Sequence, residues 1–412
     1  MKELKKALIL NPVFYVARDI ERALGLDLAI PNYYIISNYT EYGKSLAKKH
    51  KNIFLIKEKK LLDTWELLSH PIANKIIDGK HARPNILVFK NTLQIEKICQ
   101  ENDWNLLNPP SELADKIEQK ISQVKWAGAL KKYFPSYQIK QCQDIKWQGE
   151  KIIIQFNQSH TGSGTILITD KKQLEEIKTK FPKRLARTAK YIVGPLFTNN
   201  NVVWNKNILL GNINYQITGL KPFTDVEFAT IGNDWALPHK ILNKNQIAQY
   251  KKIALAVGKK MSDSYWKGAF GIDVVMDQKT KRMYLLEINA RQPASVTYES
   301  ILQKNHSLLH TAHSITTFEA HMASLLKLKY NKEKLIEIKD GAQIIQRVTN
   351  KILNIKLKIL NKLKILNFKT IKYENKKINA DLLRIQSIDG IMVRHNRFNE
   401  IGNKIMKSLE LT

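Results

Sequence analysis

The sequence predicts a protein of mixed α/β and α+β class, with three domains and a small C-terminal appendage. Three observations lead to this prediction. Short apolar runs alternate with helical segments over the first hundred residues, two strongly apolar strands form a hairpin near residue 280, and 412 residues exceed what one hydrophobic core usually organises. Apolar residues make up 43% of the chain and charged residues 25%, a composition that excludes a mainly disordered protein.

Residues 1–110 are predicted to form a doubly wound α/β domain, because strands and helices alternate there at short intervals. Buried parallel strands are expected at residues 7–11, 33–37, 53–56 and 86–89, with helices at residues 18–24, 41–49 and 65–77. The turn after the first run, NPVFYV, lacks the Gly-x-Gly-x-x-Gly pattern that lets a pyrophosphate approach the backbone. A nicotinamide-binding domain of the usual kind is therefore excluded.

Residues 111–190 are predicted to form a small second domain. One lysine-rich helix is expected over residues 111–133, with Ser111 as its N-cap and a break at Pro135. A strand at residues 151–156, a loop of small residues and a strand at residues 166–168 follow, so the loop is expected in a hairpin.

Residues 191–330 are predicted to form the central domain. Strands are expected at residues 191–193, 202–204, 208–218, 269–276 and 283–288, and helices at residues 243–260 and 316–328. Residues 331–412 are rich in Lys, Ile, Leu and Asn and predict a small basic α/β or β domain.

The chain carries a formal net charge of +30, from 67 Lys and Arg against 37 Asp and Glu. Most of these basic residues are lysines and accompany many Asn and Ile, which indicates a compositional bias rather than a patch designed to clamp phosphate. The charge favours anionic partners by electrostatic steering. A protein whose main role is nucleic-acid binding is therefore the less favoured interpretation.

The cysteine content and the lengths of the apolar runs exclude several classes of protein. Two cysteines, Cys99 and Cys142, supply neither a disulfide framework nor a zinc cluster. No apolar run approaches the roughly 20 residues that a membrane span needs, and no secretory signal is recognisable, so a cytoplasmic protein is expected. His306, His310 and His313 would share one helix face, which fits a metal site but is more typical of a partly polar helix surface.

The strongest chemical signal is the pair of strands GAFGIDVVMD (268–277) and MYLLEINAR (283–291). Folded as an antiparallel hairpin, they bring Asp273 opposite the region of Glu287 and Asn289, which share one face because they lie two residues apart. Arg291 continues that face. Two buried carboxylates need a positive partner, and hard oxygen ligands of this kind suit Mg²⁺. We expect a magnesium site here.

These strands resemble the magnesium-binding end of the ATP-grasp superfamily, and the order of the domains resembles that family from residue 1 to about residue 328. The resemblance implies an ATP-grasp fold, with residues 1–110 as the domain that precedes it, 111–190 as a small lid and 191–330 as the main part. It also implies that Asp273, Glu287 and Asn289 hold Mg²⁺ on the phosphates of ATP. Arg291 would steady the transferred phosphoryl group or a substrate carboxylate.

Other parts of the site follow from the same resemblance. ADKIEQK (114–120) resembles the family's Asp-Lys helix start, which implies Lys116 as a phosphate lysine and leaves Lys120 as the alternative. The loop that would cover the phosphates contains Gly162, Ser163, Gly164 and Thr165. The strand that would hold adenine contains Lys190, Tyr191 and Ile192, with Gln216 facing the same cleft.

Two departures from the family pattern are visible. Gln155 stands where the family has a phosphate-binding lysine, and Ala189 where many relatives have an acid. A glutamine donates a hydrogen bond but supplies no charge. Gln155 therefore marks either a distinct subgroup or a weakened site, and a degenerate ATP-binding scaffold stays open as an interpretation.

The resemblance implies an ADP-forming, ATP-dependent ligase that joins a carboxylate to an amine, with small-molecule substrates and no membrane partner. An amino acid or short peptide is the expected substrate class. Phosphotransferase or carboxylase-like chemistry at the same site is the alternative. Asn233, Asp234 and Ser295 are candidates either for orienting the substrate or for turns and caps. The sequence does not predict an oligomeric state.

Overall fold

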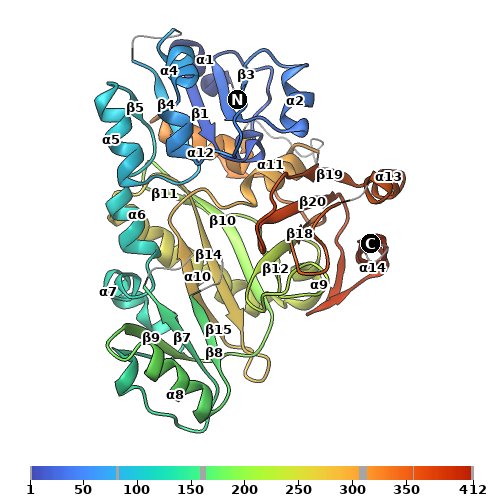
Figure 1. The fold of residues 1–412 in the computed structure, drawn as a ribbon. Helices are drawn as coiled ribbons and strands as arrows, with labels where there is room; N and C mark the ends of the chain where they lie inside the picture. The colour runs from blue at the N-terminus through green and yellow to red at the C-terminus, as the bar shows by residue number, and fades with distance from the viewer. Residues whose placement is uncertain (1, 80–82, 158–163, 306–312, 356, 410–412) are drawn as a thin grey trace.

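The computed structural model describes residues 2–79, 83–157, 164–305, 313–355 and 357–409. In Figure 1 the N-terminal domain (blue) lies at the top, a small sheet (green) at the bottom, and the largest sheet joins them, with the C-terminal strands (red) along its right-hand side. No helix in the described ranges is long and apolar enough to cross a lipid bilayer.

The N-terminal domain is the doubly wound α/β unit that the sequence predicts. Its five parallel strands have the order β3-β2-β1-β4-β5. Apolar clusters lie on both faces of the sheet, as a doubly wound fold requires. Its elements are α1 (Lys2–Leu10), β1 (Val13–Ala17), β2 (Tyr33–Asn38), α2 (Glu41–Ala47), β3 (Ile53–Ile56), α3 (Thr64–Leu68), α4 (Pro71–Asp78), β4 (Asn85–Val88), α5 (Leu93–Glu101) and β5 (Asn105–Leu106).

The predicted first strand at residues 7–11 is wrong. Most of these residues belong to α1, and the strand is β1, within the segment that we interpreted as a turn. Leu4 and Leu8 are buried one helical turn apart, while Ile9 and Leu10 are exposed. The helix expected at residues 18–24 is reduced to a single 3₁₀ turn, η1 (Ile20–Ala23).

The long helix predicted over residues 111–133 is also wrong, because the chain breaks it. The segment forms α6 (Ser111–Glu118), α7 (Ser122–Ala127) and the 3₁₀ helix η2 (Gly128–Tyr133). Gln119 leaves the helix with extended backbone. The break changes the direction in which the following lysine projects, which matters for the site described below.

The segment that the sequence predicts to be the lid forms a four-stranded antiparallel sheet. Its order is β6-β9-β7-β8, and β7 pairs with β8 as the predicted hairpin. Its elements are β6 (Tyr137–Gln141), the 3₁₀ helix η3 (Cys142–Asp144), β7 (Ile152–Phe156), β8 (Thr165–Ile168), α8 (Lys171–Lys180) and β9 (Leu185–Lys190). Ile154, Phe156, Ala186 and Leu174 of α8 form a small core between the sheet and this helix.

The main sheet has nine strands in the order β15-β14-β10-β12-β13-β18-β20-β19, with β11 paired to β10. No strand covers residues 191–193, because β9 ends at Lys190 and the next strand begins at Leu196; the expected strand at 208–218 is split in two. The elements are β10 (Leu196–Trp204), β11 (Asn207–Leu209), β12 (Asn214–Thr218), β13 (Thr230–Asp234), α9 (Leu237–Ile241), α10 (Lys244–Asp263), β14 (Gly268–Met276), β15 (Met283–Asn289), α11 (Val296–Asn305) and α12 (Thr317–Leu325).

The C-terminal residues extend the same sheet. β18 (Ala342–Arg347) pairs with β13, and β20 (Asp381–Ser387) and β19 (Lys369–Lys372) continue outward. The remaining elements are the short pair β16 (Ser314–Ile315) and β17 (Lys334–Leu335), the hairpin of β21 (Met392–Arg394) and β22 (Arg397–Phe398), and the helices α13 (Leu357–Ile365) and α14 (Glu400–Leu409). The C-terminal segment is thus joined to the main domain by backbone hydrogen bonds.

Candidate active site

The hairpin of β14 and β15 brings the predicted acidic residues together. Asp273 lies opposite Glu287, and Gly271 opposite Asn289, with an irregularity in the pairing just after Asp273. Asn289 Nδ2 donates to Asp273 Oδ2 at 3.3 Å. Ile272 and Val274, on either side of Asp273, pack into the core that contains α10, so the carboxylate projects from the opposite face of the sheet.

The electrostatics of this cluster are those of two acids held close together. Burial and then the charge of Glu287 raise the pKa of Asp273 to about 6, against the lowering effects of hydrogen bonds from Thr198 and Asn289 and of the charge of Lys120. Thr198 lies directly opposite Asp273 on β10. The cluster therefore favours a bound cation.

Lys120 supplies positive charge at this cluster. Its Nζ lies 2.6 Å from Glu287 Oε1, and its side chain is only 9% exposed. Lys116, which the family resemblance predicts at the phosphates, is exposed on α6. The break after Glu118 explains the difference, because Lys120 no longer follows the helical spacing from Lys116.

Arg291 lies where the sequence predicts it, beside the acidic face, and is held by a network of its own. Its Nη2 donates to Asn289 Oδ1 at 3.0 Å, and its Nη1 forms an ion pair with Glu118. Glu118 also pairs with Lys90 of the N-terminal domain at 2.8 Å. Burial alone would raise the pKa of Glu118, but the charges of Arg291 and Lys90 outweigh it and hold that pKa below its usual value.

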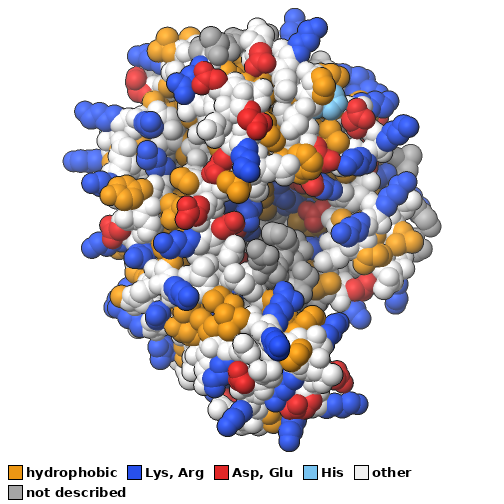
Figure 2. Space-filling model, turned by 60° about the vertical axis from the view of Figure 1, so that its left-hand side comes forward, with side chains coloured by type: hydrophobic (Ala, Val, Ile, Leu, Met, Phe, Trp, Pro, Cys, Tyr) orange, Lys and Arg blue, Asp and Glu red, His pale blue; other side chains and the backbone are white. Residues whose placement is uncertain are grey.

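The lid contributes the residues expected near the phosphates. Gln155 on β7 is half-buried, and its Nε2 donates to Thr165 Oγ1 at 3.4 Å. The Gly164 carbonyl accepts a hydrogen bond from the Phe156 N–H at the end of the hairpin next to the connecting loop. Gly162 and Ser163 lie outside the described residues. Figure 2 shows this side of the molecule hollowed between the lid and the rest, with basic and acidic side chains around the hollow.

The residues expected near adenine lie at the junction between the lid and the main sheet. Lys190 is exposed and pairs with Glu150 at 3.0 Å, while Tyr191 packs edge-on against Phe228. The main-chain N–H groups of Lys190 and Tyr191 donate to the carbonyls of Ser136 and Lys151. Ile192 follows in the linking segment before β10.

Gln216 is buried on β12. Its Nε2 donates to Thr230 Oγ1, whereas its Oε1 has no partner among the described residues. The Oε1 atom is thus a buried acceptor without a partner among the described residues.

The three candidate substrate residues are engaged in structural hydrogen bonds. Asp234 accepts four main-chain N–H bonds, from Ala236, Leu237, Ile391 and Met392. The Asn233 amide bonds to Asn214 and Gln343, and Ser295 donates to Asn200. The geometry thus gives these residues roles in turns and packing. Of the histidine group, His306 and His310 lie outside the described residues.

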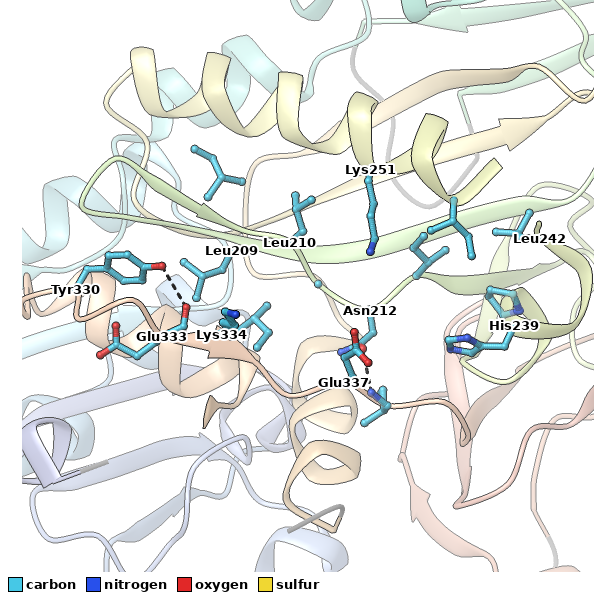
Figure 3. A pocket seen from close by; sticks show the side chains of 17 residues that line it. Leu209, Leu210, Asn212, His239, Leu242, Lys251, Tyr330, Glu333, Lys334 and Glu337 are labelled. Atoms are coloured by element: carbon cyan, nitrogen blue, oxygen red, sulfur yellow. Dashed lines mark hydrogen bonds between the residues drawn. The ribbon is translucent and has the colours of Figure 1, made fainter. Parts of the chain in front are cut away.

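A cavity of about 460 Å³ lies between β11, α9, α10 and residues 330–338 (Figure 3). Lys251, His239 and Glu337 line it, and the Tyr330 hydroxyl donates to the Glu333 carbonyl at its edge. None of the predicted site residues lines this cavity. It is therefore separate from the acidic hairpin.

No family model matches the chain, and no curated protein matches it in sequence. Solved structures match its fold. N5-carboxyaminoimidazole synthetase from Staphylococcus aureus, complexed with ADP, aligns at a TM-score of 0.65 and 12% identity over 97% of each chain. L-amino acid ligase from Bacillus licheniformis aligns at a TM-score of 0.63 and 12% identity over 97% of each chain. Biotin carboxylase from Campylobacter jejuni aligns at a TM-score of 0.63 and 12% identity, over 92% of this chain and 88% of that one.

This chain has the ATP-grasp fold. Lys120, which follows the break after α6, pairs with Glu287 of the hairpin, and the next residue, Ile121, donates its N–H to Asn157 at the end of β7. The sequence predicted Lys116 and left Lys120 as the alternative, and it did not indicate Glu118 or the buried Arg187 of β9. The alternation of β9 gave one available signal for Arg187, because an arginine stands there between residues with small side chains, Ala186 and Thr188.

Proposed function

We propose that the chain is an ATP-dependent ligase that joins a carboxylate to an amine through an acylphosphate and forms ADP. The observation that carries the proposal is the convergence of Asp273, Glu287 and Asn289 with Lys120 and Arg291 inside an ATP-grasp fold. Phosphoryl transfer mainly requires that the reacting groups are aligned and that their charge is neutralised. This set of two carboxylates, an amide oxygen and two cations can do both.

The donor set fits Mg²⁺. Asp273, Glu287 and Asn289 offer hard oxygen ligands from neighbouring positions of one hairpin. Burial and then the charge of Glu287 raise the pKa of Asp273, and a cation bound between the acids would offset both effects. When bound there, Mg²⁺ would neutralise charge on the β- and γ-phosphates of ATP.

The nucleotide would lie between the lid and the main sheet. We assign adenine to the junction of Lys190, Tyr191, Ile192 and Gln216. The Oε1 atom of Gln216 is buried and has no partner among the described residues. The phosphates would lie below the β7–β8 hairpin, where Gly164 and Thr165 follow Gly162 and Ser163. Gln155 would donate a hydrogen bond to a phosphate oxygen.

The reaction proceeds in two steps that this chain's residues would support. A substrate carboxylate oxygen attacks the γ-phosphorus, the bond to the β–γ bridging oxygen breaks, and ADP leaves. The amine nitrogen then attacks the acyl carbon, phosphate departs with the C–O bonding pair, and the amine loses a proton. Lys120 would neutralise the transferred phosphoryl group, and Arg291, oriented by Glu118 and Asn289, would hold the carboxylate.

An amino acid or short peptide is the substrate class that we propose, and the likeness to a solved L-amino acid ligase supports it. The likeness to a biotin carboxylase and to a carboxyaminoimidazole synthetase keeps carboxylase-like chemistry as the alternative. Both reactions would use the same acids and cations.

The test is to incubate the protein with MgATP and pairs of amino acids, and to follow ADP release and product mass. A ligase produces ADP only when a carboxylate and an amine are both present, with a product whose mass is their sum minus water. A stable phosphorylated product would favour a phosphotransferase, and bicarbonate-dependent ADP release would favour a carboxylase-like enzyme. The Asp273→Asn variant serves as the inactive control.

A further inference from the structure

Arg187 lies on the lid face that is turned away from α8. Its neighbour Ala186 packs with Ile154 and Phe156 in the core beneath that helix. Because side chains alternate along a strand, Arg187 projects from the other face, together with its cross-strand partners Gln155 and Ile139. Ile139 packs against the core of the main domain, so this face of the lid is directed at the main sheet.

The guanidinium of Arg187 is buried, and two of its three nitrogen atoms have no hydrogen-bonding partner among the described residues. The residue is 1% exposed, and Nε and Nη1 have no partner among the described residues. Its charge lies over the rings of Phe134, at 4.8 Å, and Tyr137, at 5.4 Å. These rings attract the cation, but they leave the in-plane N–H groups unsatisfied.

The electrostatic surroundings indicate that these N–H groups would bind an anion. Burial lowers the pKa of Arg187 to about 10, and the charges of Tyr137 and Glu287 oppose that shift. The group therefore remains charged at neutral pH, and the acid that acts on it belongs to the hairpin across the cleft. A buried cation with free donors is costly unless an anion pairs with it.

We propose that Arg187 binds the polyphosphate chain of the nucleotide from the lid side and supplies the positive charge that Gln155 lacks. This inference rests on the proposed function. A guanidinium presents donors in a planar fork that matches two phosphate oxygens. Directly opposed side chains in an antiparallel pair have Cβ atoms about 5 Å apart, so Arg187 and Gln155 can share one phosphate group.

The experiment measures binding of MgATP, adenosine and inorganic tripolyphosphate by calorimetry to the full-length protein and its variants. Arg187→Gln is expected to weaken MgATP and tripolyphosphate roughly 10- to 100-fold and to leave adenosine unchanged. The double variant Arg187→Gln with Gln155→Lys restores the charge on the neighbouring strand and should recover most of the affinity. Arg184→Gln is the matched control, because Arg184 also stacks on aromatic rings of the lid but is exposed.

A second variant covers the case in which Arg187→Gln does not fold. Gln155→Glu places a carboxylate opposite Arg187, so it is expected to raise the melting temperature of the free protein and to weaken tripolyphosphate. The inference is overturned if wild type binds MgATP and neither variant changes its affinity. If tripolyphosphate binds through Arg187 but MgATP and adenosine do not bind, the proposed function fails while the anion site stands. Absence of all binding to wild type would overturn both.

Discussion

Glu118 and Lys120, two residues apart, reach two different partners at the acidic hairpin. Glu118 pairs with Arg291 and with Lys90, whereas Lys120 pairs with Glu287. Continued helix would place these side chains about 200° apart around the axis, from 3.6 residues per turn. The extended backbone at Gln119 instead lets both contribute to the same site.

Substitution of the two candidate lysines separates their roles. Lys120→Met is expected to lower ADP formation about 100-fold or more, because it removes a buried cation beside Glu287. Lys116→Met removes an exposed charge and is expected to change the rate less than about twofold. Steady-state ADP release measures both variants. If Lys116→Met lowered ADP release more than Lys120→Met, Lys116 rather than Lys120 would be the phosphate lysine.

The buried carboxyl of Glu299 is expected to make the free energy of unfolding depend on pH. Burial raises its pKa to about 7, although Asn200, Asn212 and Thr317 donate hydrogen bonds to it. Between its ordinary pKa and this raised value, the folded protein binds more protons than the unfolded chain, so stability falls as pH rises through this window. Glu299→Gln cannot titrate. Relative to wild type, the variant should gain on the order of 1–3 kcal/mol between pH 5 and pH 8.

Urea unfolding of both proteins at pH 5 and pH 8 checks this prediction. Other buried groups, such as Asp273 and His321, are present in both proteins and cancel from the difference. A stability difference that stays constant with pH would show that Glu299 is already ionised at pH 5.

At the scale of elements, Asn157 joins the lid to the break between α6 and α7. Its Oδ1 accepts the Ile121 N–H at 3.0 Å, and its Nδ2 donates to Gln119 Oε1 at 2.8 Å. These bonds hold the main chain of Ile121 and the side chain of Gln119, the residues on either side of Lys120. The end of β7 therefore positions the lysine that meets the hairpin.

Asn157→Ala is expected to lower the free energy of unfolding by about 1–2 kcal/mol, because it leaves two bonded groups without partners. It should also reduce the rise in melting temperature that MgATP produces, since Lys120 loses its support. Gln143→Ala is the control, because Gln143 is an exposed lid amide that bonds to Gln141. Equal behaviour of the two variants in both measurements would rule out a positioning role for Asn157.

The sequence predicted best those elements in which apolar residues recur at a regular spacing. The hairpin of β14 and β15 was predicted almost to the residue because apolar residues alternate with its acids over two long strands. The first strand was misplaced because ALIL in α1 is as apolar as VFYVA in β1. The spacing of Leu4 and Leu8 alone distinguishes a helix there, and one turn is a weak period.

The residues of the candidate site also fall into two groups, those that a local pattern could predict and those that depend on tertiary contacts. Local pattern located Asp273, Glu287, Asn289 and Arg291, because strand alternation fixes their common face. It could not indicate that Lys120, rather than Lys116, contacts Glu287, because the chain leaves the helix at Gln119, whose side chain bonds to Asn157, a residue distant in sequence. Arg187 was missed for a similar reason, because Phe134 and Gln155 reach it only through tertiary packing and strand pairing.

At the scale of the whole molecule, Asp234 connects the C-terminal segment to the main sheet. One carboxylate oxygen caps the turn before α9, and the other accepts the N–H groups of Ile391 and Met392. Residues 331–412 thus share a sheet and a buried polar contact with the main domain. The boundary near residue 330 remains a prediction.

Asp234→Ala is expected to lower the free energy of unfolding by about 3 kcal/mol or more, because it leaves four buried N–H groups unsatisfied. Asp225→Ala is the comparison, because Asp225 is exposed and accepts one N–H bond, from Asn350. Its expected cost is below about 1 kcal/mol. Urea unfolding followed by circular dichroism measures both, and equal costs would mean that the bonds of Asp234 contribute little.

The charge of the whole molecule does not define a single basic surface on the face shown in Figure 2. Lys and Arg side chains are spread over the upper, middle and lower parts of that face, with Asp and Glu among them. This distribution agrees with a compositional origin of the +30 net charge. It gives no reason to prefer nucleic-acid binding over the nucleotide site.

Thermal unfolding of wild type and Glu287→Gln, with and without saturating MgATP, tests most directly whether the hairpin holds a magnesium nucleotide. A ligand at 100 times its dissociation constant adds about 2.7 kcal/mol, which raises the melting temperature by roughly 2–8 °C for domains of this size. We predict that rise for wild type, its loss when Mg²⁺ is chelated, and no rise for Glu287→Gln. An equal rise in the variant, or none in wild type, would contradict the claim.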